Sequence, residues 1–211
     1  MMWLRVVPAA LRPEDLTAAA DALRTGGIVA FPTETFYGLA VDPRSAPAVE
    51  RVFALKGRSS GQALPLIAAG VEQVATQVGT LSPLARRLAD RAWPGPLTLI
   101  IAASPALCEH VHRSTGKVAV RVTADPVARA LAERAGHPIT STSANLSGET
   151  PAVTADAVAR AFDDRLDVLI DAGRTPGGLP STIVDATGDT PLLVRAGIVA
   201  WERVLEFSKS G

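Results

Sequence analysis

The hydrophobic positions of the chain alternate between short apolar runs and longer stretches with helical spacing. The short runs predict strands at residues 4–7, 28–31, 64–68, 97–102, 118–122, from 139, 168–170, 181–184 and 192–195. The helical stretches predict helices from 13 to about 25, after 45, and at 71–78, 82–92, from 125, 154–162 and 201–207. Strands that alternate with helices predict an α/β fold.

Residues at the ends of these segments support the assignment. Ser45, Asp125 and Thr154 precede helical stretches and are typical N-caps. Gly188-Asp189 separates the last two strands at the spacing of a hairpin, so we expect a mixed sheet that is mainly parallel and twisted. With 211 residues, the chain is predicted to form a single domain, 1–211, with a core from about 10 to 207, and with helices packed on the sheet.

Two segments place polar side chains directly after an apolar strand. In the first, Pro32 ends the strand and is followed by Thr33, Thr35 and Tyr37; in the second, polar residues crowd residues 141–147. Turn formation and helix capping are the alternative explanation. Because burying so many polar groups without partners is costly, we favour a single ligand pocket that both segments line.

Four cationic residues, in three places along the chain, are candidates for binding anions. Lys56-Gly57-Arg58 is followed by Ser59-Ser60 and resembles a phosphate-contacting loop, although a solvated surface loop explains it as well. Arg121 and Arg195 each lie at the end of a predicted strand, where the planar guanidinium suits a carboxylate. The alternative for both arginines is an outward, solubilising role.

Composition restricts the class of protein. The 21 acidic and 21 basic residues balance, so no overall field favours a nucleic acid. The single Cys108 forms no internal disulfide, and the cluster that it makes with His110 and His112 lacks the paired spacings of a zinc site. The start of the chain does not resemble a signal peptide, and no apolar run approaches the roughly 20 residues that span a bilayer. We therefore expect a cytoplasmic protein without a membrane partner.

Seven short blocks occur in an order that is typical of one family. They are Phe31-Pro32-Thr33-Glu34-Thr35-Phe36-Tyr37-Gly38-Leu39, Lys56-Gly57-Arg58, Pro94-Gly95-Pro96-Leu97-Thr98, Val118-Ala119-Val120-Arg121-Val122, Thr142-Ser143-Ala144-Asn145-Leu146-Ser147-Gly148, Ser181-Thr182-Ile183-Val184-Asp185 and Arg195-Ala196-Gly197. Together they resemble the YrdC family, whose best known members are L-threonylcarbamoyladenylate synthases of tRNA modification.

The resemblance implies a YrdC-like sheet with a large concave active surface. It also implies condensation of L-threonine, bicarbonate and ATP to threonylcarbamoyl-AMP and pyrophosphate, for N6-threonylcarbamoyladenosine at position 37 of tRNA. The implied catalytic residues are Lys56, Arg58, Ser143 and Asn145. The implied threonine contacts are Thr33, Thr35, Arg121, Ser141 and Ser181. The implied ATP contacts are Lys56, Arg58, Ser60, Lys117, Ser143, Pro151 and Arg195.

Further expectations follow from the same resemblance. Magnesium would accompany ATP without a ligand from a protein side chain, and a tRNA-modification transferase would receive the product. The run Ala63-Leu64-Pro65 departs from the asparagine that many relatives carry before this proline, which weakens any threonine contact there. The chain ends near Gly211 without the extra domain of longer relatives, so no closure by such a domain is expected.

Two other functions remain open at this stage. A paralogue of the YciO type would share the sheet and lack the synthase activity. An RNA-binding module of the same fold would bind RNA tightly, with an affinity that falls steeply as the salt concentration rises, whereas a synthase would bind RNA only weakly. The related hydrogenase maturation factor is set aside, because the chain lacks its zinc-finger cysteines.

Overall fold

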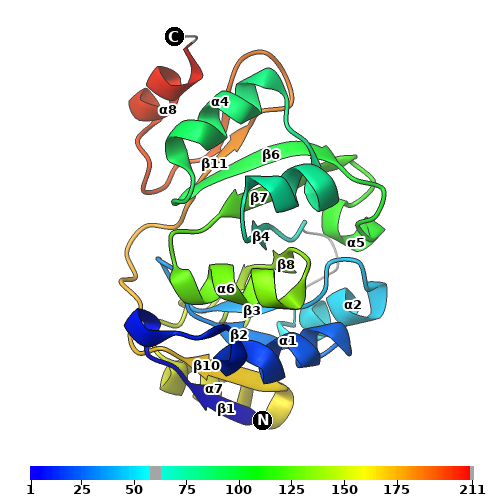
Figure 1. The fold of residues 1–211 in the computed structure, drawn as a ribbon, viewed down its shortest axis with the longest axis vertical. Helices are drawn as coiled ribbons and strands as arrows, with labels where there is room; N and C mark the ends of the chain where they lie inside the picture. Colours follow the sequence, from blue (N-terminus) through cyan, green and yellow to red (C-terminus); the bar gives the residue numbers. More distant parts are fainter. Residues whose placement is uncertain (58–62, 210–211) are drawn as a thin grey trace.

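The computed structural model describes residues 1–57 and 63–209, which form two mixed sheets with helices packed around them (Figure 1). The five-stranded sheet has the order β1 (Met2–Arg5), β10 (Val168–Asp171), β2 (Val29–Phe31), β3 (Gly38–Ala40) and β9 (Thr142–Ser143). The second sheet has the order β12 (Leu192–Arg195), β11 (Thr182–Asp185), β6 (Leu97–Ala103), β7 (Lys117–Val122), β4 (Leu66–Ala68) and β8 (Ile139–Thr140), with β5 (Gly79–Thr80) paired to β6.

The α-helices lie on the outer faces of these sheets. They are α1 (Thr17–Arg24), α2 (Ala46–Leu55), α3 (Val71–Gln73), α4 (Pro83–Ala92), α5 (Glu109–His112), α6 (Pro126–Ala135), α7 (Ala155–Phe162) and α8 (Trp201–Ser208). Shorter helical segments are η1 (Pro8–Ala10), η2 (Pro13–Leu16), the π-helical η3 (Val74–Val78) and η4 (Asp163–Arg165). The predicted N-caps are confirmed, because Ser45, Asp125 and Thr154 each accept a hydrogen bond from the first turn of the following helix.

The sequence predicts one mainly parallel sheet, and the structure differs from this in the number of sheets and in the direction of the strands. The α/β class and the mixed sheet are confirmed, and β11 and β12 form the antiparallel hairpin. Among the described residues, however, four strand pairings are parallel and six are antiparallel, so the sheets are not mainly parallel. One of the antiparallel pairings has a local cause: Pro32 ends β2, the chain reverses, and β3 returns antiparallel to β2.

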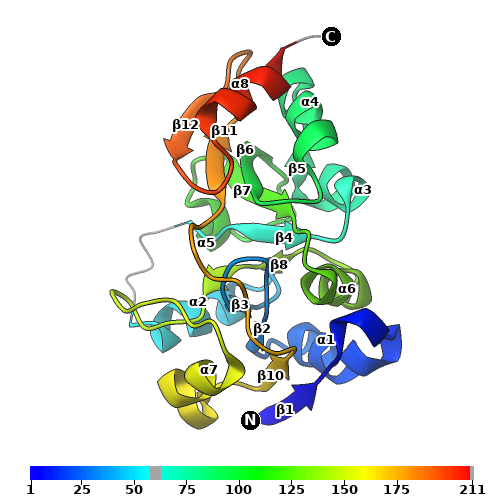
Figure 2. The same cartoon turned by 90° about the vertical axis from the view of Figure 1, so that its left-hand side faces the viewer.

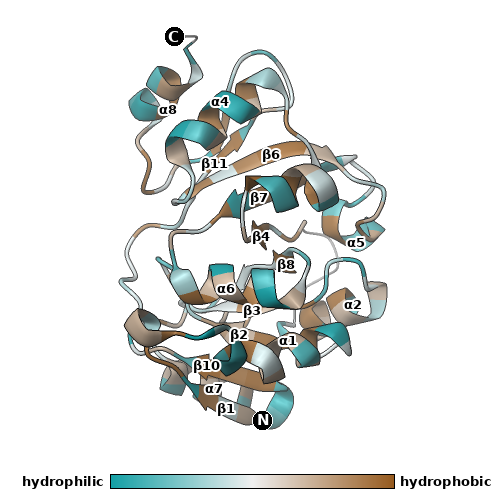
Figure 3. Cartoon of the chain, viewed as in Figure 1, coloured by the Kyte–Doolittle hydropathy of each residue, from teal (hydrophilic) through white to brown (hydrophobic). Residues whose placement is uncertain are grey.

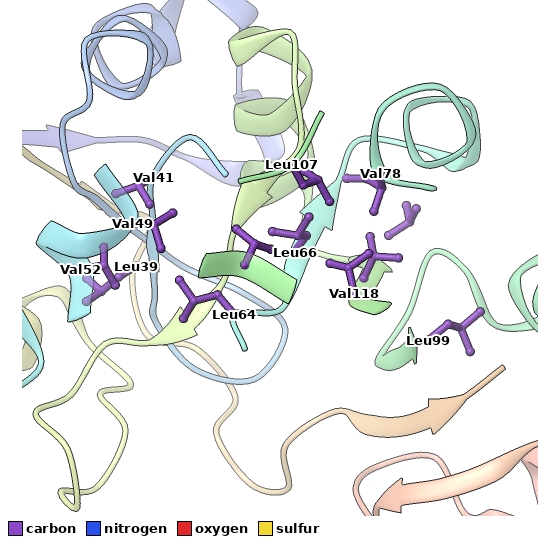
Figure 4. Packing of buried hydrophobic residues seen from close by; sticks show 14 of the residues in the cluster. Leu39, Val41, Val49, Val52, Leu64, Leu66, Val78, Leu99, Leu107 and Val118 are labelled. Carbon is purple, nitrogen blue, oxygen red and sulfur yellow. The ribbon is translucent and has the colours of Figure 1, made fainter. Parts of the chain in front are cut away.

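The largest buried cluster draws side chains from both sheets. Ile28 and Leu39 come from the five-stranded side, and Leu66, Leu99 and Val118 come from the seven-stranded side. Figure 4 shows several of these residues packed between the strands and helices. In Figure 3 the strands β2, β6 and β10 are mostly hydrophobic, whereas α4 and α6 carry hydrophilic outer faces. Burial of this apolar surface is the main favourable contribution to folding.

Strand β12 is an exception to this burial. It forms the edge of its sheet beside α8 (Figure 2), and all four of its residues are exposed. Leu192 and Val194 keep 62% and 56% of their surface accessible. Within the described ranges, no helix is long and apolar enough to cross a membrane.

Gly197 follows β12 and packs against the segment that leads into β11. A Cβ atom at Gly197 would lie 2.2 Å from the Pro180 carbonyl oxygen and 2.6 Å from the backbone nitrogen of Thr182. Only glycine allows this approach, since a Cβ there would collide with backbone atoms that cannot rotate away.

The first prediction is that Gly197→Ala lowers the free energy of unfolding by about 2 kcal/mol or more, because the 180–182 backbone must shift. Gly188→Ala is the matched control, since a Cβ there meets nothing within 4 Å. The control should leave that free energy unchanged or raise it by up to about 1 kcal/mol. Urea unfolding of both variants measures the difference, and equal losses would contradict the prediction.

Candidate functional site

A cavity of about 420 Å³ lies where the two sheets meet. The chain passes from one sheet to the other at Ser141, because β8 pairs with β4 in one sheet and β9 pairs with β3 in the other. Ligand pockets are common where the chain crosses between two structural units in this way. The cavity is lined by Thr33, Thr35, Phe36, Tyr37, Gly38, Ala63, Pro65, Leu66, Thr98, Ile100, Ala119, Arg121, Ser141, Thr142, Ser143, Pro180, Ser181, Ile183, Val194 and Arg195.

The turn after β2 brings two threonines to the cavity wall. Thr33 Oγ1 accepts hydrogen bonds from the backbone nitrogens of Thr35 (3.1 Å) and Phe36 (3.3 Å), and donates to the Phe36 carbonyl at 2.7 Å. Because its one proton is used there, Thr35 donates in the 3.1 Å contact between the two hydroxyls. Thr33 therefore holds the turn, as the alternative explanation of this segment expected, and both threonines line the cavity.

Arg121 is the buried cation of the cavity. Only 8% of the residue is exposed, and no hydrogen bond joins its guanidinium to any residue in the described ranges. Its Nε lies 3.5 Å from Glu34 Oε1. Burial lowers the pKa of Arg121, while the carboxylates of Glu34 and Asp125 act to raise it. A guanidinium stays charged at such a site, so its terminal nitrogens are available to an anion.

Ser181 connects the start of β6 with β12. Thr98 Oγ1 donates to Ser181 Oγ at 2.9 Å, and Arg195 Nη2 donates to the same oxygen at 3.1 Å. Arg195 also donates to the Ser181 carbonyl through Nη2 at 2.8 Å. Burial lowers the pKa of Arg195, and so does the positive charge of Arg121. The two arginines therefore contribute positive charge to the same cavity.

Lys56 holds the polar segment that follows β9. Its Nζ donates to the Asn145 carbonyl at 2.7 Å and to the Ser143 carbonyl, and its own carbonyl accepts from the Ser147 nitrogen at 3.0 Å. The lysine is 3% exposed and does not line the cavity. Asn145 Nδ2 donates to the carbonyls of Leu146 and Glu149, both at 2.8 Å. Lys56 and Asn145 thus shape the backbone that presents Ser143.

The structure brings most of the predicted site residues to one place. Seven of them line the cavity, namely Thr33, Thr35, Arg121, Ser141, Ser143, Ser181 and Arg195. Lys117 does not line it and pairs with Asp185, with Nζ 2.8 Å from Oδ2. Pro151 is also outside the lining, beside Ala152, whose carbonyl accepts from the Tyr37 nitrogen. Arg58 and Ser60 lie outside the described residues.

The structure also adds two residues that were not predicted as part of the site. Thr98 is 1% exposed and donates to Ser181, and Glu34 lies beside Arg121. Both occur in the family blocks, which is the signal that could have identified them. Among the described residues, no group of three or more His, Cys, Asp or Glu is placed to hold a metal ion. A magnesium ion that accompanies ATP therefore stays a prediction.

Comparison with known proteins gives a consistent result. The family model Sua5_yciO_yrdC, described as "Telomere recombination", matches residues 21–197. A Halorhodospira halophila protein named threonylcarbamoyl-AMP synthase is 44% identical over 180 residues, which cover 84% of this chain and 93% of that protein. A Bacillus subtilis protein of the same name is 37% identical over 190 residues, covering 90% of this chain and 55% of its own length.

Two solved structures are also similar over nearly the whole chain. Sua5 from Pyrococcus abyssi, complexed with L-threonine, has a TM-score of 0.90 at 34% identity, and the match covers 98% of this chain and 60% of that one. Escherichia coli YciO has a TM-score of 0.86 at 25% identity, and the match covers 97% of this chain and 100% of that one. The chain thus spans little more than half the length of some relatives.

The second prediction concerns the buried lysine. Lys56→Met keeps a long side chain but removes the donor from two carbonyls, so the free energy of unfolding should fall by about 2–3 kcal/mol. Lys209→Met is the matched control, since Lys209 is exposed next to α8. Urea unfolding checks both variants. If Lys56→Met were as stable as the control, Lys56 would not be holding the 143–145 backbone.

Proposed function

The chain belongs to the Sua5/YciO/YrdC family, and from this premise we propose that it is a threonylcarbamoyl-AMP synthase. The observation that carries the proposal is a buried guanidinium without a hydrogen-bond partner in the described residues, surrounded by hydroxyl groups in one cavity. This combination suits an amino acid whose own side chain bears a hydroxyl, because a carboxylate needs the cation and the hydroxyl needs hydrogen-bond partners. L-Threonine fits both requirements.

The proposed reaction joins L-threonine, bicarbonate and ATP. The neutral amine of threonine takes up the carboxyl carbon as a carbamate, with loss of water from bicarbonate. A carbamate oxygen then attacks the α-phosphorus of ATP, and pyrophosphate leaves with the electrons of the broken phosphorus–oxygen bond. None of these steps requires a covalent enzyme intermediate, so the protein acts by placing the reactants together and by stabilising charge.

Each cavity residue has a definite part in this proposal. Arg121 binds the threonine carboxylate through its terminal nitrogens, and Thr35, Ser141 and Ser181 offer hydroxyl groups nearby. Arg195, at the rim on β12, supplies positive charge for the nucleotide phosphates. Magnesium bound to the phosphates would neutralise the charge that develops on the departing pyrophosphate.

The apolar floor completes the binding surface. Ile100, Ala119 and Ile183 line the cavity from three neighbouring strands, β6, β7 and β11. They share one face of the sheet. Ile100 pairs with Ala119. Ile183 pairs with Thr98, which is two residues before Ile100 and therefore points to the same side. This floor suits the flat, weakly polar surface of a base, so ATP can lie along the sheet while threonine lies near Arg121.

The product is unstable in water by the chemistry of a mixed anhydride, so a transferase that modifies tRNA should receive it directly. A cytoplasmic location follows from the same proposal.

A YciO-type function without synthase activity is the second candidate, and the observation that favours it is the structural similarity to E. coli YciO over nearly the whole chain. The two candidates differ in one measurable property, which is release of pyrophosphate that requires threonine, bicarbonate and ATP together.

The third prediction uses Arg121→Lys, which keeps the charge and removes the fork that binds a carboxylate through two nitrogens. The concentration of threonine needed for half-maximal pyrophosphate release should rise by about tenfold to a hundredfold, while that of ATP changes by less than about threefold. Arg203→Lys is the control, because Arg203 pairs with Glu206 on the exposed surface of α8. It should leave both values unchanged.

Two results would contradict the proposed function. Absence of pyrophosphate release from the wild-type chain with all three substrates would favour the YciO-type candidate. An equal rise in the threonine and ATP requirements of Arg121→Lys would show that Arg121 does not recognise threonine in particular.

A further inference from the structure

Glu34 lies behind the cavity wall rather than in it. Its neighbours Thr33 and Thr35 line the cavity, whereas Glu34 does not. Its side chain is only 15% exposed. A carboxylate this deeply buried is costly unless nearby groups compensate its charge, so the surroundings of Glu34 should explain its presence.

The nearest cation to Glu34 is the guanidinium of Arg121. Glu34 Oε1 lies 3.5 Å from Arg121 Nε, and neither atom has a hydrogen-bond partner among the described residues. A guanidinium can bind a carboxylate through its two terminal nitrogens, or through Nε and one terminal nitrogen. Glu34 occupies the Nε edge. The edge formed by the two terminal nitrogens is therefore the one left for a ligand.

A second set of contacts fixes the orientation of Glu34 itself. The hydroxyl of Thr123 donates to Glu34 Oε2, and Thr123 is fully buried. The same hydroxyl accepts a hydrogen bond from the backbone nitrogen of Asp125 at 3.2 Å, so its one proton is directed to Glu34. Asp125 in turn caps α6 through the nitrogens of Val127 and Ala128, both at 2.9 Å. The carboxylate is thus attached to the start of a helix.

From this geometry we infer that Glu34 is a positioning residue for Arg121. It holds the Nε edge of the guanidinium, so that the two terminal nitrogens face the cavity and bind the carboxylate of the ligand end-on. The inference rests on the proposed function, because it specifies how the same cavity recognises threonine. Thr123 contributes to the same positioning, because its hydrogen bond to Glu34 Oε2 fixes the orientation of the carboxylate beside Arg121.

A different role for Glu34 would be charge compensation alone. In that case the carboxylate would stabilise the buried arginine from any nearby position, and its orientation would not affect the ligand. The two roles differ in what they do to ligands with and without a carboxylate. Only a change in the position of Arg121 weakens the carboxylate-bearing ligand selectively.

The experiment is calorimetric titration with L-threonine and with L-threoninamide, in which an uncharged amide replaces the carboxylate. The variants are Glu34→Asp, which keeps the charge but withdraws it by one methylene, and Thr123→Val, which keeps the shape and removes the hydroxyl. Thr76→Val is the control, because the exposed Thr76 hydroxyl donates only to the Glu72 carbonyl, at 2.9 Å. Circular dichroism confirms that each variant is folded.

The wild type should bind threonine more tightly than threoninamide by at least about tenfold. Glu34→Asp should reduce this preference by roughly tenfold, and Thr123→Val should reduce it by a smaller factor, with threoninamide affinity nearly unchanged. Thr76→Val should keep the wild-type preference. If only one of the two site variants folds, that variant alone decides the result.

Two outcomes would overturn the inference. If the site variants bind both ligands more weakly by the same factor, or keep the wild-type preference, then Glu34 does not position Arg121, although the proposed function stands. If the wild type binds no threonine at all, the proposed function fails and this inference fails with it. Titration of the wild type therefore separates the two failures.

Discussion

The chemistry of the molecule depends on one guanidinium held away from water. Burying an isolated cation costs several kcal/mol, because the cation loses its hydration and apolar surroundings provide no compensating interaction. In this protein Glu34 and Asp125 offset part of that cost for Arg121 from behind the cavity. On the proposed function, the carboxylate of the ligand would offset the rest from the cavity side. On the same proposal, affinity for a carboxylate would thus be built into the folded chain before any ligand arrives, at the cavity between the two sheets.

Much of this arrangement is predictable from the sequence. The apolar runs locate most strands, and Ser45, Asp125 and Thr154 locate helix starts because capping is a local effect. The polar segments after β2 and before Ser147 meet in one cavity, as their density predicted. The mixed strand directions were not predictable in the same way. The strands β3, β8 and β9 have two or three residues each, which is too few to show a periodicity.

Side-chain roles were harder to infer than locations. Lys56 is predicted to contact the ligand, and the structure adds that its Nζ donates to the Ser143 and Asn145 carbonyls. A sequence shows that a lysine follows a helix, but not which carbonyls converge on its amine from residues almost ninety positions away. Glu34 and Thr98 were missed for a related reason. Each acts through a contact between segments that are distant in the chain, and such contacts leave no periodic signal.

The two arginines of the cavity differ in how firmly the sheet holds them. Arg121 is on β7, which has a paired strand on both sides, whereas Arg195 is on β12, which has a paired strand on one side only. Strands at an edge, with exposed backbone groups and few buried neighbours, open at a lower free energy than central ones. The wall of the cavity on β7 is consequently held by more strand pairing than the wall on β12. On the proposed function, threonine would be recognised at the firmly held wall, and the wall on β12 would open more readily for the larger nucleotide to enter and leave.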